Sequence, residues 1–422
     1  MATRIKPHYA WIVLAVTFLT LLASAGVRAV PGVLIIPLEQ EFHWTRATIS
    51  FAISVNLLLY GLMGPFAGAL MQSFGVRRTT MTAMAMLAVG VALATKITAA
   101  WQLILLWGVV VGLATGMVAI VLGATVVNRW FVERRGLALG ILTASTATGQ
   151  LVFLPMIEHH GWRWAIWIVA GASAVMIPLV GFFMRDRPAD VGAIAFGATA
   201  NDVVAPLKTN PAAAAIAALG DGVRSRDFWL LFATFFICGA STNGLVATHL
   251  IPAAHDHGIP EVRAAGLLAL MGVFDLVGTT GSGWLTDRWD SRALLAWYYS
   301  LRGLSLIFLP FALAGGNMSL LVFAVWYGLD WIATVPPTVK LATDAFGKER
   351  APIMFGWIAA GHQLGAAITA FSAGWIRTTL GDYQFAFWIS GGLCVIAALL
   401  SLAVGRRSSL LTPTLPPTAF ET

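Results

Sequence analysis

Twelve long apolar runs, separated by polar breaks, restrict the folds that are open to this chain. Each run is long enough to cross a bilayer, which takes about 20 apolar residues. Only helices and closed β-barrels can span lipid, and these runs are too long and too uniformly apolar for barrel strands. We therefore expect an all-α polytopic membrane protein with 12 transmembrane helices. The runs cover about 9–37, 46–72, 79–98, 101–128, 135–156, 162–184, 227–253, 262–286, 292–314, 318–341, 352–376 and 384–404.

Composition supports a membrane protein and argues against an enzyme. The chain is 58% hydrophobic and only 11% charged, whereas soluble domains carry about 25% charged residues. No cleavable signal peptide is expected, because the first apolar run is too long. The sequence contains no phosphate-binding loop, no nucleotide-binding glycine motif and no Cys/His metal spacing. We expect no enzymatic activity, no cofactor and no metal site, and we interpret Cys238 and Cys394 as packing residues in apolar runs.

The runs fall into two groups of six around a long polar stretch. We predict an N-terminal six-helix bundle at 1–184, a central loop at 185–226, and a C-terminal six-helix bundle with a short tail at 227–422. In other membrane proteins, two such halves rock against each other around a site near the membrane midplane. This organisation is typical of a secondary transporter.

The distribution of positive charge predicts the orientation in the membrane. With the N-terminus inside, 18 of the 26 lysines and arginines fall on the cytoplasmic side and five on the outside, while Arg28, Arg302 and Lys340 lie within spans. Cytoplasmic loops of membrane proteins carry this excess. We expect cytoplasmic N- and C-termini, and the net charge of +7 then needs no nucleic-acid partner.

A loop motif occurs once in each half. Gly68 is followed by Gln72-Ser73 and Arg77, and Gly283 is followed by Asp287-Arg288 and Arg292. Through this repeat the chain resembles the major facilitator superfamily over essentially its whole length. The first copy departs from the family pattern, because Gln72 and Ser73 replace the usual Asp-Arg pair.

Other stretches resemble bacterial monocarboxylate and oxalate–formate porters. They are Gly26-Val-Arg28, the Arg129-Trp-Phe segment with Glu133 and Arg134, and Arg185-Asp-Arg187-Pro188. This resemblance implies a monomeric carrier in a bacterial inner membrane that moves small carboxylates with protons or in exchange. It also implies that Asp287, Arg288, Glu133 and Arg134 hold the two halves together when the outside is open. The eighth span lacks the arginine that many such porters carry, since it reads Asp275-Leu-Val-Gly278-Thr279.

Arg28 is the only charged residue in the first run. A charge at this depth costs about 2.5–3.5 kcal/mol on insertion scales and predicts a functional position facing protein or water. We interpret it as the binding partner of an anion, with a structural ion pair as the alternative. On the eleventh span, His362 and Gln363 are further candidates for substrate binding. His362 could hold the anion when protonated, or it could be a neutral, hydrogen-bonded side chain.

Four more polar residues are candidates for hydrogen bonds to a carboxylate. Asn56 and Tyr60 stand four residues apart and therefore share one helix face. Gln150 and Tyr327 are weaker candidates of the same kind. Packing within the bundle is the alternative for each.

Asp275, Arg302 and Asp330 form a second group. Counting from the helix ends at 1.5 Å per residue places all three at one depth. Two carboxylates around one guanidinium would neutralise most of its buried charge in a fixed structural triad. The alternative is a proton switch, in which a carboxylate binds and releases a proton while the arginine keeps its charge.

The sequence therefore favours a secondary active transporter of a small, monocarboxylate-like organic anion, coupled to protons and working by alternating access. The anion and the proton would cross as a neutral load. The alternative is a proton-driven exporter or carrier of cationic or zwitterionic compounds, with Asp275 and Asp330 as their partners. The expected partners are the substrate, the proton and the lipid bilayer.

Overall fold

The computed structural model describes residues 8–134, 137–138, 140–142, 145, 162–198, 211–347 and 350–405. Within these ranges the chain is almost wholly helical, and ten helical segments are long and apolar enough to cross a membrane. The predicted eleventh span corresponds to the 30-residue helix α17 (Ala351–Leu380). Most of the predicted fifth span, 135–156, lies outside the described residues. The predicted all-helical membrane fold is confirmed.

One group of helices precedes residue 184 and surrounds the first apolar core. Its elements are α1 (Tyr9–Ala29), α2 (Pro31–Phe42), α3 (Arg46–Ser73), α4 (Val76–Ala94), α5 (Ala100–Leu103), the π-helix η1 (Ile104–Val111), α6 (Gly112–Met117), α7 (Ile120–Trp130) and α9 (Trp162–Phe183). We call this group the N-half. Its buried side chains form one cluster, to which Ala370 of α17 also belongs.

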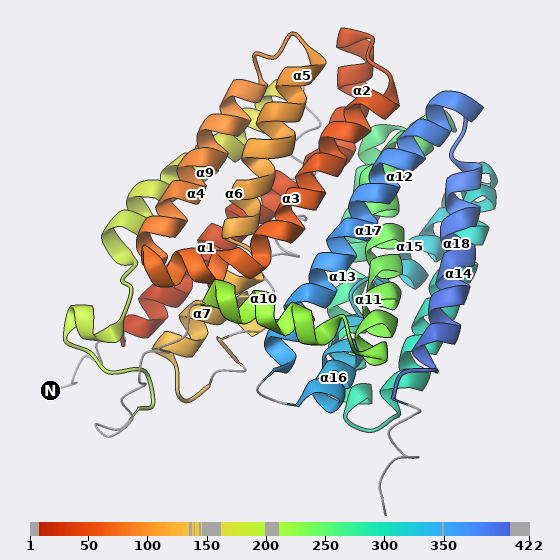
Figure 1. Cartoon of the computed structure of the whole chain (residues 1–422). Helices are drawn as coiled ribbons and strands as arrows, with labels where there is room; N and C mark the ends of the chain where they lie inside the picture. The colour runs from red at the N-terminus through yellow and green to blue at the C-terminus, as the bar shows by residue number, and fades with distance from the viewer. Residues whose placement is uncertain are drawn as a thin grey trace, which may run out of the picture.

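A second group of helices follows residue 225 and surrounds its own core. Its elements are α11 (Arg226–Gly239), the π-helix η4 (Ala240–Val246), α12 (Ala247–Asp256), α13 (Glu261–Thr286), α14 (Ser291–Gly315), α15 (Asn317–Asp330), α16 (Val335–Phe346), α17 and α18 (Gln384–Ser401). We call this group the C-half. Val33 of α2 belongs to its core, so each half inserts a side chain into the core of the other. Figure 1 shows the two groups side by side.

Several spans predicted as continuous helices are interrupted. The first divides at Val30 into α1 and α2, because Pro31 has no N–H to continue the helical bonding and instead begins a new helix. The fourth is interrupted at 118–119 and the tenth at 331–334, while the seventh contains the π-helix η4. Among the described residues the first, fourth and tenth spans are thus divided, whereas the seventh stays helical and changes to π-helical bonding over Ala240–Val246. Discontinuous helices of this kind form binding sites in transporters.

The two halves meet chiefly along α3 and α17, which run antiparallel, and along α2 and α12. Glycines allow the close approach. A side chain on Gly374 would collide with Ser50, and one on Gly61 would collide with Gln363. From Ser50 to Gly61 the contact extends about 16 Å along α3 at 1.5 Å per residue. Gly64, one turn further on, would meet nothing within 4 Å.

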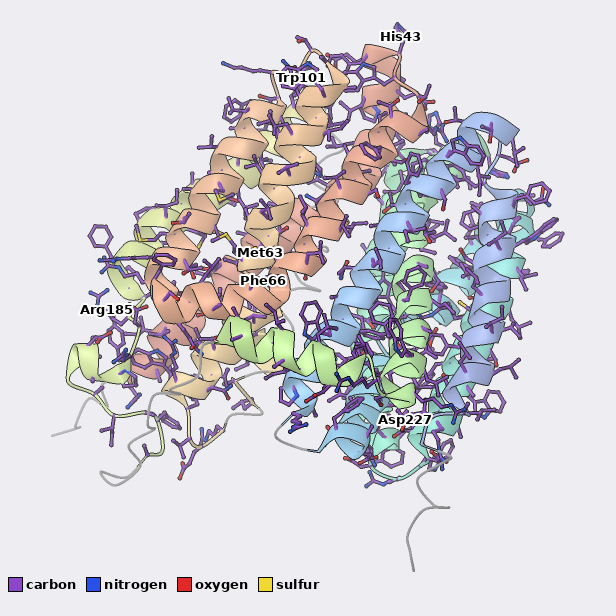
Figure 2. All side chains as sticks on the ribbon, in the orientation of Figure 1. His43, Met63, Phe66, Trp101, Arg185 and Asp227 are labelled. Atoms are coloured by element: carbon purple, nitrogen blue, oxygen red, sulfur yellow. The ribbon has the colours of Figure 1, made fainter. Side chains whose placement is uncertain are left out.

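The two ends of the molecule therefore differ. We call the end that carries Arg46 the Arg46 end and the opposite end the α10 end, after the helix α10 (Pro211–Gly222). His43 and Trp101 mark the Arg46 end in Figure 2, and Asp227 marks the α10 end. The contact between α3 and α17 is tight from the Arg46 end as far as Gly61 and loosens beyond it.

Helix α10 lies across the α10 end and contacts both halves through α3 and α17. Figure 2 shows it beside Met63 and Phe66 of α3. The Trp357 indole donates to the Ala215 carbonyl over 2.8 Å, which fastens α10 to α17. This stretch was predicted as part of a loop, but it contains a run of alanine, the residue with the highest helix propensity, and forms a helix. A 3₁₀ turn, η3 (Pro188–Val191), also lies in the predicted loop.

Candidate functional site

Arg28 lies on the last turn of α1, next to the break in the first span. Its Nη1 donates to the Tyr60 hydroxyl over 3.1 Å, and its guanidinium carbon lies 5.2 Å from the centre of the Tyr60 ring. Its Nε is buried and has no hydrogen-bond partner among the described residues. No carboxylate within that part of the chain forms an ion pair with it. The structural ion pair that was the alternative for Arg28 is thus not found among the described residues.

Gln363 and His362 of α17 also carry unpartnered polar atoms. Gln363 packs against Gly61, the neighbour of Tyr60. Its Oε1, and the Nδ1 of His362, are buried and have no hydrogen-bond partner among the described residues. Buried polar side chains normally have such a partner, and each exception calls for an explanation. Gln363 thus lies at the contact between the halves, against the residue next to Tyr60, while the His362 ring packs against Phe235 of α11 with 4.9 Å between the ring centres.

The other predicted hydrogen-bonding residues have different surroundings. The Asn56 amide donates to the Trp107 carbonyl over 2.6 Å, which joins α3 to η1. The Tyr327 hydroxyl donates to the Ser241 carbonyl over 2.8 Å, inside the C-half. Both side chains bond to backbone within their own halves, and the structure does not bring them to Arg28. Gln150 lies outside the described residues.

Arg302 and Asp330 form a fully buried ion pair in the C-half. Arg302 Nε donates to Asp330 Oδ2 over 2.6 Å, and its Nη2 donates to the backbone carbonyls of Asp330 and Trp331. The guanidinium is 0% exposed. The second carboxylate oxygen of Asp330 has no partner among the described residues. The predicted pairing of Arg302 with a carboxylate at the same depth is present.

Asp275 differs from the predicted arrangement of two carboxylates around one guanidinium. Its Oδ1 accepts hydrogen bonds from the backbone N–H of Ile332 and from the Thr279 hydroxyl, both over 2.9 Å. Ile332 lies in the interruption between α15 and α16, where the helix no longer supplies a partner for its N–H. Asp275 thus stabilises the broken tenth span from α13, and no direct bond joins it to Arg302 in the described structure.

Cys238 lies between the Arg302–Asp330 pair and α17. This role was not predicted from the sequence. Arg302 Nη1 lies 2.9 Å from Cys238 Sγ, and the Thr334 hydroxyl lies 3.3 Å from it. The neighbouring Gly239 packs so closely on α17 that a side chain there would collide with the His362 carbonyl. Cys238 is therefore a polar contact between the Arg302–Asp330 pair and the helix turn that carries His362. Cysteine in an apolar run gave no signal of this.

An ion-pair network closes the Arg46 end. Arg46 of α3 pairs with Glu39 of α2 over 2.9 Å and with Asp256 of α12 over 2.7 Å, and Arg377 of α17 pairs with Asp256 over 2.7 Å. Arg46 is only 4% exposed. Its Nη1 also donates to the Tyr383 hydroxyl over 3.4 Å, and burial raises the pKa of that phenol to about 12. The network joins the two halves and was not predicted from the sequence.

The residues predicted to hold the halves together at the other end do not do so in this conformation. Arg288 donates to the Trp284 carbonyl one turn earlier, and Asp287 ends α13. Arg134 lies over the Phe196 ring at 6.0 Å, and Glu133 packs against Gly197. None of the four forms an ion pair between the halves within the described part of the chain. Their absence from the interface agrees with the looser packing beyond Gly61.

Comparison with known proteins identifies the family. The family profile described as Major Facilitator Superfamily matches residues 16–351 and 332–419. The chain belongs to the major facilitator superfamily. The predicted resemblance is thereby confirmed, and the protein is a secondary transporter in a membrane rather than an enzyme.

Relatives and solved structures agree with this assignment. The chain is 24% identical over 416 residues to "Uncharacterized MFS-type transporter YcxA" of Bacillus subtilis (strain 168), covering 95% of both chains. It is 25% identical over 430 residues to "Monocarboxylate transporter 13" of Bos taurus, covering 99% of this chain and 95% of the relative. A point mutant of the nucleoside transporter NupG has a similar fold, with a TM-score of 0.74 at 13% identity over 94% of this chain and 100% of that one. A D-xylose-proton symporter gives 0.71 at 14% identity over 94% of this chain and 98% of that one.

Proposed function

We propose that this transporter carries a small, monocarboxylate-like organic anion together with a proton. The observation that carries the proposal is Arg28, a charged residue within a span that has a tyrosine but no carboxylate beside it in the described structure. A guanidinium that is not neutralised by the protein can bind a carboxylate with charge-assisted hydrogen bonds. The monocarboxylate transporters among the relatives support this choice of substrate class.

The substrate would bind between the halves. Arg28 and Tyr60 belong to the N-half, and Gln363 and His362 belong to the C-half. An anion that contacts both the N-half and the C-half stabilises the conformation in which the binding residues of the two halves are close together. A ligand can drive a conformational change only if it binds one conformation better than the other. The unpartnered Nε of Arg28, Oε1 of Gln363 and Nδ1 of His362 are the atoms offered for this contact.

Proton coupling would involve Asp330 and His362. Asp330 has one carboxylate oxygen bonded to Arg302 and one without a partner in the described residues. Protonation of this carboxylate would weaken its ion pair with Arg302, whose guanidinium also contacts Cys238 beside His362. A change in protonation at Asp330 can therefore alter the helix turn that faces the anion. Cotransport of the anion with one proton moves no net charge across the membrane potential.

We also infer an orientation and a conformation. The excess of lysine and arginine on the N-terminal side supports cytoplasmic termini in a bacterial inner membrane. With that orientation, the Arg46 end faces outward and is closed, and the α10 end faces the cytoplasm. The structure would then represent an inward-facing state of alternating access.

The alternative proposal, a carrier of cationic or zwitterionic compounds, needs carboxylates that are free to bind a cation. Asp330 is paired with Arg302, and Asp275 holds the N–H of Ile332. Both acids are thus already engaged, which favours the anion.

The test is uptake of labelled monocarboxylates into proteoliposomes, with and without an inward proton gradient. We expect Arg28→Gln to lower uptake about 10- to 100-fold, since one hydrogen bond to a charged group contributes about 1.5–3 kcal/mol. Lys96→Gln, which removes an exposed charge in the turn after α4, serves as the matched control. Gradient-driven uptake that survives Arg28→Gln would refute the anion site, and retained transport of cations would favour the alternative.

A further inference from the structure

Four arginines gather in a surface pocket of the N-half at the α10 end. The pocket has a volume of about 680 Å³ and is lined by Arg77 and Arg78 of α4, Arg129 of α7, and Arg187 after α9. We call it the arginine pocket. Arg185, labelled in Figure 2, follows α9 and precedes the lining residues Asp186 and Arg187. It lies within one half, away from the contact between α3 and α17.

The carboxylates beside the guanidiniums of the arginine pocket bond to backbone N–H groups and form no direct ion pair with these guanidiniums among the described residues. Asp186 Oδ1 accepts from the backbone N–H of Arg77 over 2.9 Å, and Asp190 Oδ2 accepts from the backbone N–H of Arg187 over 2.9 Å. The two acids thus serve the backbone at the start of α4 and of η3. No ion pair of any of the four arginines is found in the described residues, and Arg129 donates only to the Asp186 carbonyl.

This arrangement leaves a site for an anion. Four guanidiniums against two carboxylates give a net charge of +2 in one cavity. Like charges that converge from three separate segments repel one another unless a counter-ion lies between them. Guanidinium groups bind phosphate oxygens in bidentate pairs.

The surroundings of the pocket indicate a lipid. Phe74, which lines it, is 60% exposed, and Phe182 at the end of α9 is 72% exposed. Exposed aromatic side chains beside a basic cavity place an apolar surface next to the charges, as an amphipathic ligand requires. Basic pockets at the ends of transmembrane helices bind the headgroups of anionic lipids.

We propose that the arginine pocket binds the phosphate headgroup of an anionic phospholipid, with the acyl chains lying against Phe74 and Phe182. The proposal is independent of the transported substrate, because the pocket does not include Arg28 or its neighbours. Bound lipid would stabilise the position of α4 relative to α7 and α9, since each of these segments contributes an arginine or leads into one.

The test uses the whole purified protein in a neutral detergent. Phosphatidylglycerol, phosphatidylcholine or inorganic phosphate is added, and retained lipid is counted by native mass spectrometry. We expect phosphatidylglycerol to bind and phosphatidylcholine to be lost. Arg77→Gln/Arg187→Gln should weaken phosphatidylglycerol binding about 25-fold, or about fivefold for each arginine near the surface.

The matched control is Arg224→Gln/Arg226→Gln, which removes two exposed charges at the same end of the molecule outside the pocket. It should bind phosphatidylglycerol like the wild type. Arg77→Lys/Arg187→Lys keeps the two charges without the bidentate geometry and should bind more tightly than the glutamine variant but less tightly than the wild type. Thermal unfolding of both variants shows whether they are folded. Equal losses in the two glutamine variants would overturn the proposal in favour of a general surface-charge effect. Displacement of the lipid by millimolar inorganic phosphate, or equal retention of phosphatidylcholine, would also overturn it.

Discussion

The bond between Arg46 and Asp256 should determine how often the Arg46 end opens. Asp256 accepts from both Nη atoms of Arg46 over 2.7 Å, and its side chain is only 17% exposed. This bidentate pair joins the N-half to the C-half, whereas Arg377 bonds Asp256 from within the C-half. A half-buried, charge-assisted pair contributes about 2 kcal/mol. In Asp256→Asn, Arg46 keeps Glu39 as a partner, so no unpaired buried charge complicates the result.

A loss of about 2 kcal/mol shifts the ratio of closed to open forms about 30-fold, since 1.4 kcal/mol corresponds to a factor of ten. If the open form is about 1% of the wild type, it should reach about a quarter in Asp256→Asn. Spin labels at Gln40→Cys on α2 and Thr379→Cys on α17, both exposed positions, report the separation of the halves by double electron–electron resonance. The native cysteines are buried and should remain unlabelled.

The matched control is Arg377→Gln, which removes a bond to the same carboxylate without removing a link between the halves. It should shift the distance distribution much less than Asp256→Asn. An unchanged distribution in Asp256→Asn would contradict the reasoning, as would an equal shift in the two variants. In either case the close packing of α3 on α17, rather than the ion pairs, would hold this end closed.

Three further outcomes follow from the same contacts. Gly61→Ala should lower stability by about 1–3 kcal/mol because its methyl group collides with the facing helix, while Gly64→Ala should not, as thermal unfolding would show. Tyr60→Phe should raise the KM for the anion about fivefold by removing one hydrogen bond near Arg28, and an unchanged KM would argue against a role in binding. Arg302→Met should cost about 3–5 kcal/mol by leaving Asp330 buried and unpaired, and Arg302→Met/Asp330→Leu should recover most of the folded yield.

The fold could be predicted because a bilayer imposes a length on each span, and length is read directly from a sequence. The depth of a residue in the membrane could be predicted from its distance to the end of its span, and Arg302 and Asp330, predicted at one depth, lie close enough to pair. The direction in which a side chain points around the helix axis could not be predicted, because it depends on which neighbouring helix each face packs against. Asp275 was placed at the right depth, yet its carboxylate faces the interrupted tenth span.

Ion pairs between distant segments of the chain could not be predicted from the sequence. Arg46 and Asp256 are 210 residues apart, and each belongs to a different half. Near the end of a span, a charged residue is expected from topology alone, so neither residue carried a signal of a specific partner. Cys238 was missed for the opposite reason, because a thiol in an apolar run is usually a packing residue.

The contacts of the two buried acids favour different roles for them. Asp275 accepts two hydrogen bonds, one of them from a backbone N–H that the broken helix leaves unpaired. Protonating it would weaken both bonds and destabilise the interruption in the tenth span. Asp330 has an oxygen with no partner in the described residues, so a proton there displaces no hydrogen-bond donor, although it removes the negative charge that pairs with Arg302. A coupling group must change its charge in every cycle while the fold stays intact. We therefore propose Asp330 rather than Asp275 for this role, because Arg302 would keep its hydrogen bonds to the backbone carbonyls of Asp330 and Trp331 when the carboxylate is protonated.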